Sequence, residues 1–170
     1  LKGGRVIIVG LQTDWMVKGM DVTETKETGD AFREAFRGTF YGILRWPQLD
    51  DLWQSINHEA DSNWYVYAVG EPPPTETVAA ADLIRFIDEL DELLHREHKE
   101  DYCGIVYADD VNSPGFVKVF DPLNLGVSCG YSDYPPVPGW ILSRLPPIDL
   151  QAPAPLPGNR RRWWQRLFSS

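Results

Sequence analysis

The sequence predicts an α+β fold, with a small mixed β-sheet in the order β-α-α-β-α-β-β and helices packed on one face. Two patterns indicate it: short β-branched or aromatic runs typical of strands, and apolar residues spaced by three and four, typical of core-facing helices. The chain has 170 residues, 43% of them apolar, which suits one domain with its own core. We expect that domain at residues 1–150, a proline-rich linker at 151–158 and a basic-aromatic tail at 159–170.

Four apolar runs are expected to form the strands. They lie at residues 5–11, 64–69, 103–108 and 116–120. The last two flank turn-forming residues, which favours a hairpin with a long loop.

Two long segments are expected to be irregular. Residues 12–29 are polar and contain two glycines, so we expect a loop there. Residues 121–150 are rich in glycine and proline, so we expect them to wrap around the body, with Trp140, Ile141 and Leu142 anchoring the wrap by burial.

Three helices are expected between the strands. Asp30 can cap the first, and Pro47 suits the first turn of the second. The longest begins at Thr75 or Thr77 and runs to about His98. Its apolar stripe is that of a core-facing helix. The positions expected to face the core in the second and third helices are Leu49, Leu52, Trp53, Ile56, Leu83, Phe86, Ile87, Leu90, Leu93 and Leu94.

Charge is unevenly distributed along the chain. The net charge is -9, although residues 160–166 hold four arginines and no acid, so the remainder of the chain carries -13. An acidic body repels phosphates, and we therefore expect no nucleic acid partner.

The C-terminal tail is the most unusual segment. Wound as a helix, it places Trp163, Trp164 and Leu167 on one broad side. That pattern suits docking into a groove on a protein partner, peripheral contact with an anionic membrane, or folding back on the acidic helix of its own domain. A free basic end is the remaining alternative. The residues expected to bind a partner are Tyr41, Asp50, Asp51, Trp53, Arg160, Arg161, Arg162, Trp163, Trp164, Arg166 and Phe168.

Nucleotide-binding motifs are incomplete. The strand at 5–11 contains Gly10, but the further glycines of a dinucleotide-binding fingerprint do not follow it, and no phosphate-binding P-loop is present. We expect no cofactor.

The cysteines and histidines provide two weaker alternatives. His95, His98, Cys103 and Cys129 could hold a zinc ion, since two histidines three apart on a helix can face one ion. Cys103 and His98 could instead form a catalytic pair, although the acids around them would raise the pKa of the thiol. Two cysteines are too few for a secreted disulfide framework, and the longest apolar runs fall far short of the ~20 residues of a membrane span, so we expect a cytoplasmic protein.

One segment resembles the barstar family of ribonuclease inhibitors. Phe40-Tyr41-Gly42, followed by Leu49-Asp50-Asp51-Leu52-Trp53, is similar to that family's aromatic-Tyr-Gly turn and Leu-Asp-x-Leu-Trp helix, and the expected element order over 5–108 is similar as well. The resemblance implies an acidic helix that binds a basic partner, with Tyr41, Gly42, Asp50 and Trp53 at family positions. Four extra residues after the glycine and Gln54 at an acidic contact position depart from the pattern, so ribonuclease inhibition is not inferred.

These patterns together favour a non-catalytic accessory or adaptor protein. It would bind protein partners through an acidic helical surface and the tethered tail. The alternatives are a thiol- or metal-dependent enzyme using Cys103 and His98, and a peripheral membrane protein attached through the tail.

Overall fold

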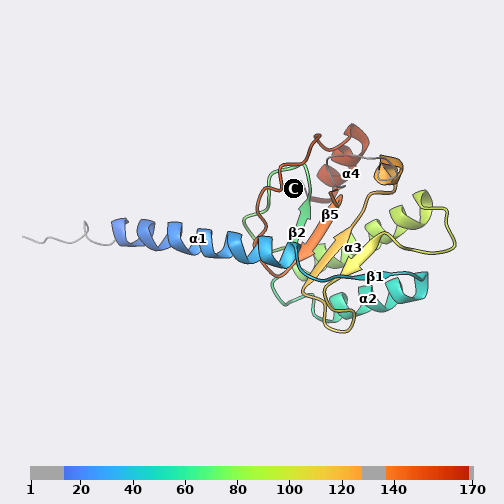
Figure 1. Cartoon of the computed structure of the whole chain (residues 1–170), viewed down its shortest axis with the longest axis horizontal. Helices are drawn as coiled ribbons and strands as arrows, with labels where there is room; N and C mark the ends of the chain where they lie inside the picture. The colour runs from blue at the N-terminus through green and yellow to red at the C-terminus, as the bar shows by residue number, and fades with distance from the viewer. Residues whose placement is uncertain (1–13, 128–136, 169–170) are drawn as a thin grey trace, which may run out of the picture.

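The computed structural model describes residues 14–127 and 137–168 and shows an α+β fold, as predicted (Figure 1). Four α-helices, five strands and one 3-10 helix form it within these ranges. In chain order they are α1 (Asp14–Phe36), β1 (Tyr41–Ile43), α2 (Trp46–His58), β2 (Tyr65–Ala68), α3 (Ala80–Glu97), β3 (Val106–Ala108), β4 (Phe116–Val119), η1 (Pro122–Val127), β5 (Trp140–Ser143) and α4 (Gly158–Phe168).

The five strands form one sheet in the order β1-β3-β4-β5-β2. All four pairings are antiparallel, where the sequence had suggested a mixed sheet. The expected strands at 64–69, 103–108 and 116–120 are present with shorter bounds, and the last two form the predicted hairpin. The strand expected at 5–11 lies outside the described residues.

The expectation of irregular structure at 121–150 is wrong for β5. This strand lies between β4 and β2, where Tyr67 pairs with Ile141 and Val117 with Leu142. All four of its side chains are buried, so its sequence lacks the polar alternation of a half-exposed strand. Trp140, Ile141 and Leu142 do anchor the segment by burial, as expected.

Helices cover both faces of the sheet, not one. Val66 and Ala68 of β2 face the core formed with α2 and α3. The alternating residue Tyr67 faces the opposite side, where it belongs to a second cluster with Phe32 of α1. This alternation follows from the pleat, which points successive side chains to opposite faces.

Helix α1 replaces the loop expected at 12–29. It extends away from the body, and its C-terminal end contacts the sheet (Figure 1). There Phe32 packs on Phe116 with ring centroids 5.1 Å apart. Helix propensity favours this segment, because its straight-chain Lys, Glu and Met residues are good helix formers and offset its two glycines.

The first expected helix forms the C-terminal part of α1, so Asp30 lies inside that helix and does not cap it. The second and third expected helices are confirmed. α2 has Pro47 in its first turn and buries the four predicted positions. α3 buries all six of its predicted positions. It begins at Ala80, later than expected, because residues before it run extended and Val78 donates a backbone hydrogen bond to Trp64.

Candidate functional site

The C-terminal tail folds back on its own domain as helix α4. Leu167 is buried, and Trp163, Trp164 and Phe168 are partly buried against the core. All three rings surround Phe86 of α3, with centroids 5.8–6.0 Å from its ring. Of the dispositions that the sequence left open, this is the contact with the domain's own acidic helix.

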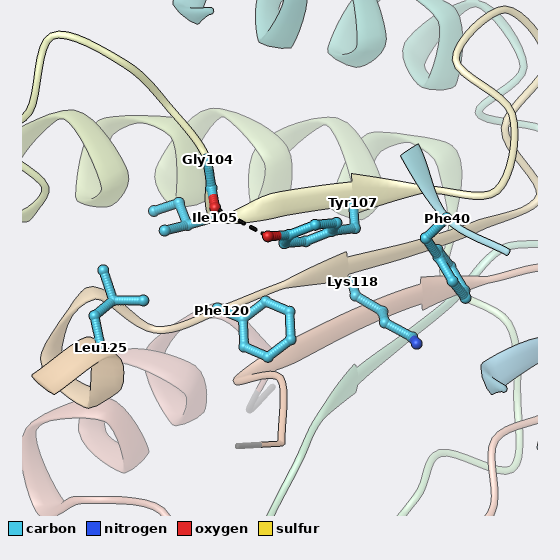
Figure 2. Close-up of a pocket in the computed structure, with 7 residues that line it drawn as sticks. All are labelled: Phe40, Gly104, Ile105, Tyr107, Lys118, Phe120 and Leu125. Carbon is cyan, nitrogen blue, oxygen red and sulfur yellow. Dashed lines mark hydrogen bonds between the residues drawn. The ribbon is translucent and has the colours of Figure 1, made fainter. Parts of the chain in front are cut away.

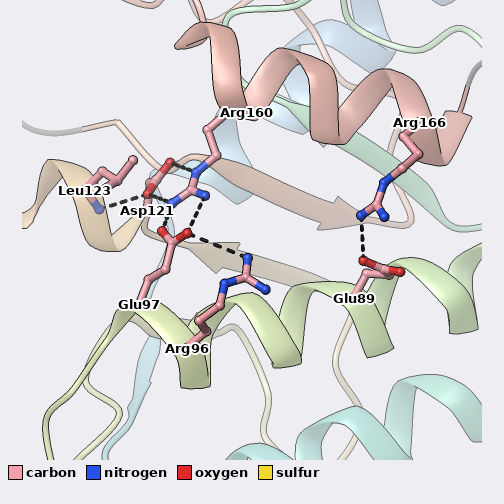
Figure 3. Close-up of polar contacts among 7 residues, drawn as sticks. All are labelled: Glu89, Arg96, Glu97, Asp121, Leu123, Arg160 and Arg166. Atoms are coloured by element: carbon pink, nitrogen blue, oxygen red, sulfur yellow. Dashed lines mark hydrogen bonds and ion pairs between the residues drawn. The ribbon is translucent and has the colours of Figure 1, made fainter.

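Arg160 fixes the start of α4 through a buried ion pair (Figure 3). Its side chain is 3% exposed, and its Nε and Nη2 atoms each donate to Asp121, both over 2.9 Å. Nη1 and Nη2 donate to the two carboxylate oxygens of Glu97. Burial alone would lower the pKa of Arg160, but the hydrogen bonds to Asp121 and Glu97 raise it above its usual value. The guanidinium is therefore charged and unavailable to a partner.

Two further arginines of α4 also pair within the chain. Arg166 contacts Glu89 of α3 at 3.0 Å (Figure 3), and Arg161 contacts Glu71 at 3.0 Å. Arg162 is the one arginine of the tail with neither an ion pair nor a hydrogen bond in the part of the chain that the structure describes. Most of the tail's positive charge is thus used inside the molecule.

On the side of α3 that faces α2, carboxylates are left without an arginine partner within the described ranges. Asp88 and Asp91 have no Lys or Arg partner among the described residues. Both line a groove between α2 and α3, opposite Asp50. Residues 46–61, which include α2, hold four carboxylates and no lysine or arginine. We call this feature the acidic groove; it has a volume of about 370 Å³ and is lined by Asp50, Trp53, Gln54, Asn57, Ile87, Asp88 and Asp91.

Hydrogen bonds hold part of the acidic groove in place. The indole N–H of Trp53 donates to Asp91 Oδ1 over 2.9 Å. Oδ2 of the same carboxylate lies 3.6 Å from Nε2 of His95. The side-chain oxygen of Asn57 is buried without a hydrogen-bond donor, which is unfavourable unless a donor is supplied. The groove therefore presents oxygen acceptors, of which Asp91 is held by Trp53, and its lining contains no Lys or Arg among the described residues.

The structure distributes the predicted partner-binding residues differently from the prediction. Asp50 and Asp51 are exposed on α2, and Tyr41 is 58% exposed on edge strand β1. Trp53 is 5% exposed, so it forms part of the buried wall of the groove and its ring is not available for contact with a partner. Sequence reasoning did not single out Asp91 or Asn57, because only the packing of α2 on α3 brings them together.

The alternative zinc site of His95, His98, Cys103 and Cys129 does not form among its three described members. His98 and Cys103 are buried, whereas His95 is exposed and faces Asp91. Cys129 lies outside the described residues. Instead, ligand atoms of Asp50, Asp91 and His95 lie within 4.8 Å of one another.

The geometry of Cys103 and His98 is not that of an activated thiol. His98 Nε2 donates to the backbone carbonyl oxygen of Cys103 over 2.8 Å. Cys103 is fully buried, and burial raises the pKa of its thiol, so the reactive thiolate is disfavoured. The contact joins the end of α3 to the segment that precedes β3.

A second cavity, of about 380 Å³, lies against the other face of the sheet (Figure 2). Phe40, Tyr107 and Phe120 line it together with Lys118. Lys118 Nζ donates to the carbonyl of Phe36 over 2.6 Å and lies over the ring of Phe40 at 3.8 Å. Because Phe36 is the last residue of α1, this lysine serves to fix the end of that helix to the sheet.

Comparisons with known proteins identify no relative. No family model matches the chain, and neither the curated proteins nor the solved structures contain a match. Among the described residues, no helix has the length and apolar character needed to cross a membrane.

Proposed function

We propose that the protein is a non-catalytic accessory protein that binds a basic protein partner through the acidic groove. What supports it is that some carboxylates of α3 are paired with arginines of α4 and others are not. Glu89 and Glu97 are neutralised by arginines of α4, whereas Asp88 and Asp91 face α2 without such partners among the described residues.

An arginine side chain fits the groove better than a lysine. Its planar guanidinium has five N–H donors, which can contact several acceptors at once. Asp50, Asp88 and Asp91 supply carboxylate oxygens, and Asn57 supplies a buried oxygen that lacks a donor. The tail then has a supporting role, because its arginines and indoles are engaged with α3 rather than with a partner.

A direct test uses a fluorescent octa-arginine peptide and anisotropy. The variant Asp50→Asn with Asp88→Asn removes two groove charges, and its matched control, Asp61→Asn with Asp101→Asn, removes two exposed charges elsewhere. Charge-assisted hydrogen bonds contribute roughly 1.5–3 kcal/mol each, so we expect the groove variant to bind at least about tenfold more weakly. The control should change binding by less than about twofold, because Asp61 and Asp101 do not line the groove and act on the peptide only through long-range attraction that salt screens.

Two outcomes bear directly on the proposal. Octa-lysine should bind more weakly than octa-arginine, because it lacks the planar donor array. Equal losses in the groove variant and its control would show general charge attraction and would refute a groove site. The partner itself can be captured with a photo-reactive residue at Gln54, which is exposed and lines the groove. We expect a crosslinked basic protein that is lost in the Asp50→Asn, Asp88→Asn variant.

A further inference from the structure

We propose that Asp50, Asp91 and His95 form a binding site for a divalent transition-metal ion of the Zn²⁺ class, at one end of the acidic groove. This proposal does not depend on a protein partner. It replaces the ligand set suggested by the sequence, because it retains His95 and exchanges His98 and the cysteines for two carboxylates.

The spacing of the ligand atoms supports the site. Asp91 and His95 are four residues apart on α3, so both side chains lie on one face of the helix. Asp91 Oδ2 and His95 Nε2 are 3.6 Å apart. Two atoms that bind one ion at 2.0–2.2 Å can be up to about 4.2 Å apart, so this pair can share an ion as it stands. Asp50 approaches from α2 with all three ligand atoms within 4.8 Å, which a small side-chain rotation can close.

Two tryptophans outside the ligand set orient the ligands. Trp53 Nε1 donates to Asp91 Oδ1, which leaves Oδ2 directed to the site. The Trp46 ring stacks on His95 with centroids 4.1 Å apart and an interplanar angle of 31°. Trp46 is itself held, because its Nε1 donates to the carbonyl of Glu100 over 3.1 Å. Such outer contacts fix ligand orientation in metal sites and affect affinity by about 10–100-fold.

The donor set indicates which ions fit. An imidazole nitrogen favours Zn²⁺, Co²⁺ or Ni²⁺ over Ca²⁺ and Mg²⁺, which prefer oxygen ligands alone. Three protein ligands leave at least one position for water, as in open zinc sites. A bound dication would also cancel the charge of Asp50 and Asp91. It would therefore compete with a basic side chain for the same end of the groove.

The test is titration of the tag-free, chelator-treated full chain with Co²⁺ and Zn²⁺. We expect one ion per chain, visible as Co²⁺ absorption bands in the visible range that Zn²⁺ abolishes and excess Mg²⁺ does not. His95→Gln and Asp50→Asn should each weaken Zn²⁺ binding at least tenfold by calorimetry. The matched controls His58→Gln and Asp51→Asn change an exposed histidine and the adjacent acid on α2, and they should bind as the parent protein does.

A third variant tests the orienting contact. Trp53→Phe removes the N–H donor to Asp91 and keeps an aromatic ring in the core, so Zn²⁺ affinity should fall by about tenfold while circular dichroism shows an unchanged helix content. Failure to bind one ion, or an equal loss in the His58 and His95 variants, would overturn the site. His95→Gln also separates the two proposals, because it should weaken Zn²⁺ binding at least tenfold and leave binding of octa-arginine intact.

Discussion

Replacement of Arg160 by methionine tests whether the buried ion pair holds α4 on the domain. Methionine preserves the unbranched apolar stem but removes all four hydrogen bonds to Asp121 and Glu97. Asp121 is 3% exposed and would keep only the backbone N–H of Leu123 as a donor among the described contacts. A buried charge that loses its partner costs about 3–5 kcal/mol, a large share of the ~5–15 kcal/mol by which domains of this size are stable.

Urea denaturation followed by circular dichroism gives the free energy of unfolding. Arg162→Met is the matched control, because the neighbouring arginine is exposed and should change stability by less than about 0.5 kcal/mol. Combining Arg160→Met with Asp121→Asn removes the isolated charge and should recover part of the lost stability. Trypsin cleavage after Arg161 and Arg162 should be faster in Arg160→Met, since α4 is released more often.

A loss below about 1 kcal/mol in Arg160→Met would refute this reasoning. Such a value is typical of a solvent-exposed ion pair, whose contribution is small. The helix would then be held by Phe86 and the rings around it, and the arginine would be incidental.

Two further predictions concern pKa shifts. The hydrogen bond from Arg160 lowers the pKa of Glu97 below its ordinary 4.5, so its stabilisation is fully present above that pH and is lost as the pH falls through the folded-state value. Urea denaturation should therefore show Glu97→Gln to be less stable than the parent protein at pH 7, and the difference should shrink on acidification; a constant difference would contradict the assignment, and Glu92→Gln serves as the control. Because Cys103 is buried and its pKa is raised, it should react with a thiol reagent far more slowly in the folded protein than in urea, and equal rates would show that the thiol is accessible.

Elements with a regular apolar period were predictable from the sequence. α2 and α3 bury the positions that their spacing of three and four residues indicated. α1 and β5 escaped prediction for opposite physical reasons. The apolar residues of α1 do not form one continuous helical stripe, whereas β5 is buried on both faces and lies among prolines and glycines.

The candidate site was predictable in part. The acids Asp50 and Asp51 were expected to face a partner, and they are exposed. The groove itself could not be predicted, because Asp50 and Asp91 are 41 positions apart and meet only when α2 packs on α3. The buried pairing of Arg160 with Asp121 is equally non-local, and it decides that the tail is a structural element of the domain. The resemblance to the barstar family stays a prediction.

The order of strands in the sheet has a consequence for how the protein is made. β2 lies at an edge of the sheet, and its one strand partner in the described sheet is β5. Tyr65 can therefore pair with Ser143 only after Ser143 has been synthesised. A growing polypeptide leaving the ribosome therefore exposes the apolar β2 segment through the synthesis of more than seventy further residues. Contacts so distant in sequence slow folding, and an unpaired edge invites aggregation. Ribosome-bound chains that stop before residue 140 should accordingly recruit chaperones, and full-length chains released from the ribosome, in which β5 can pair with β2, should not.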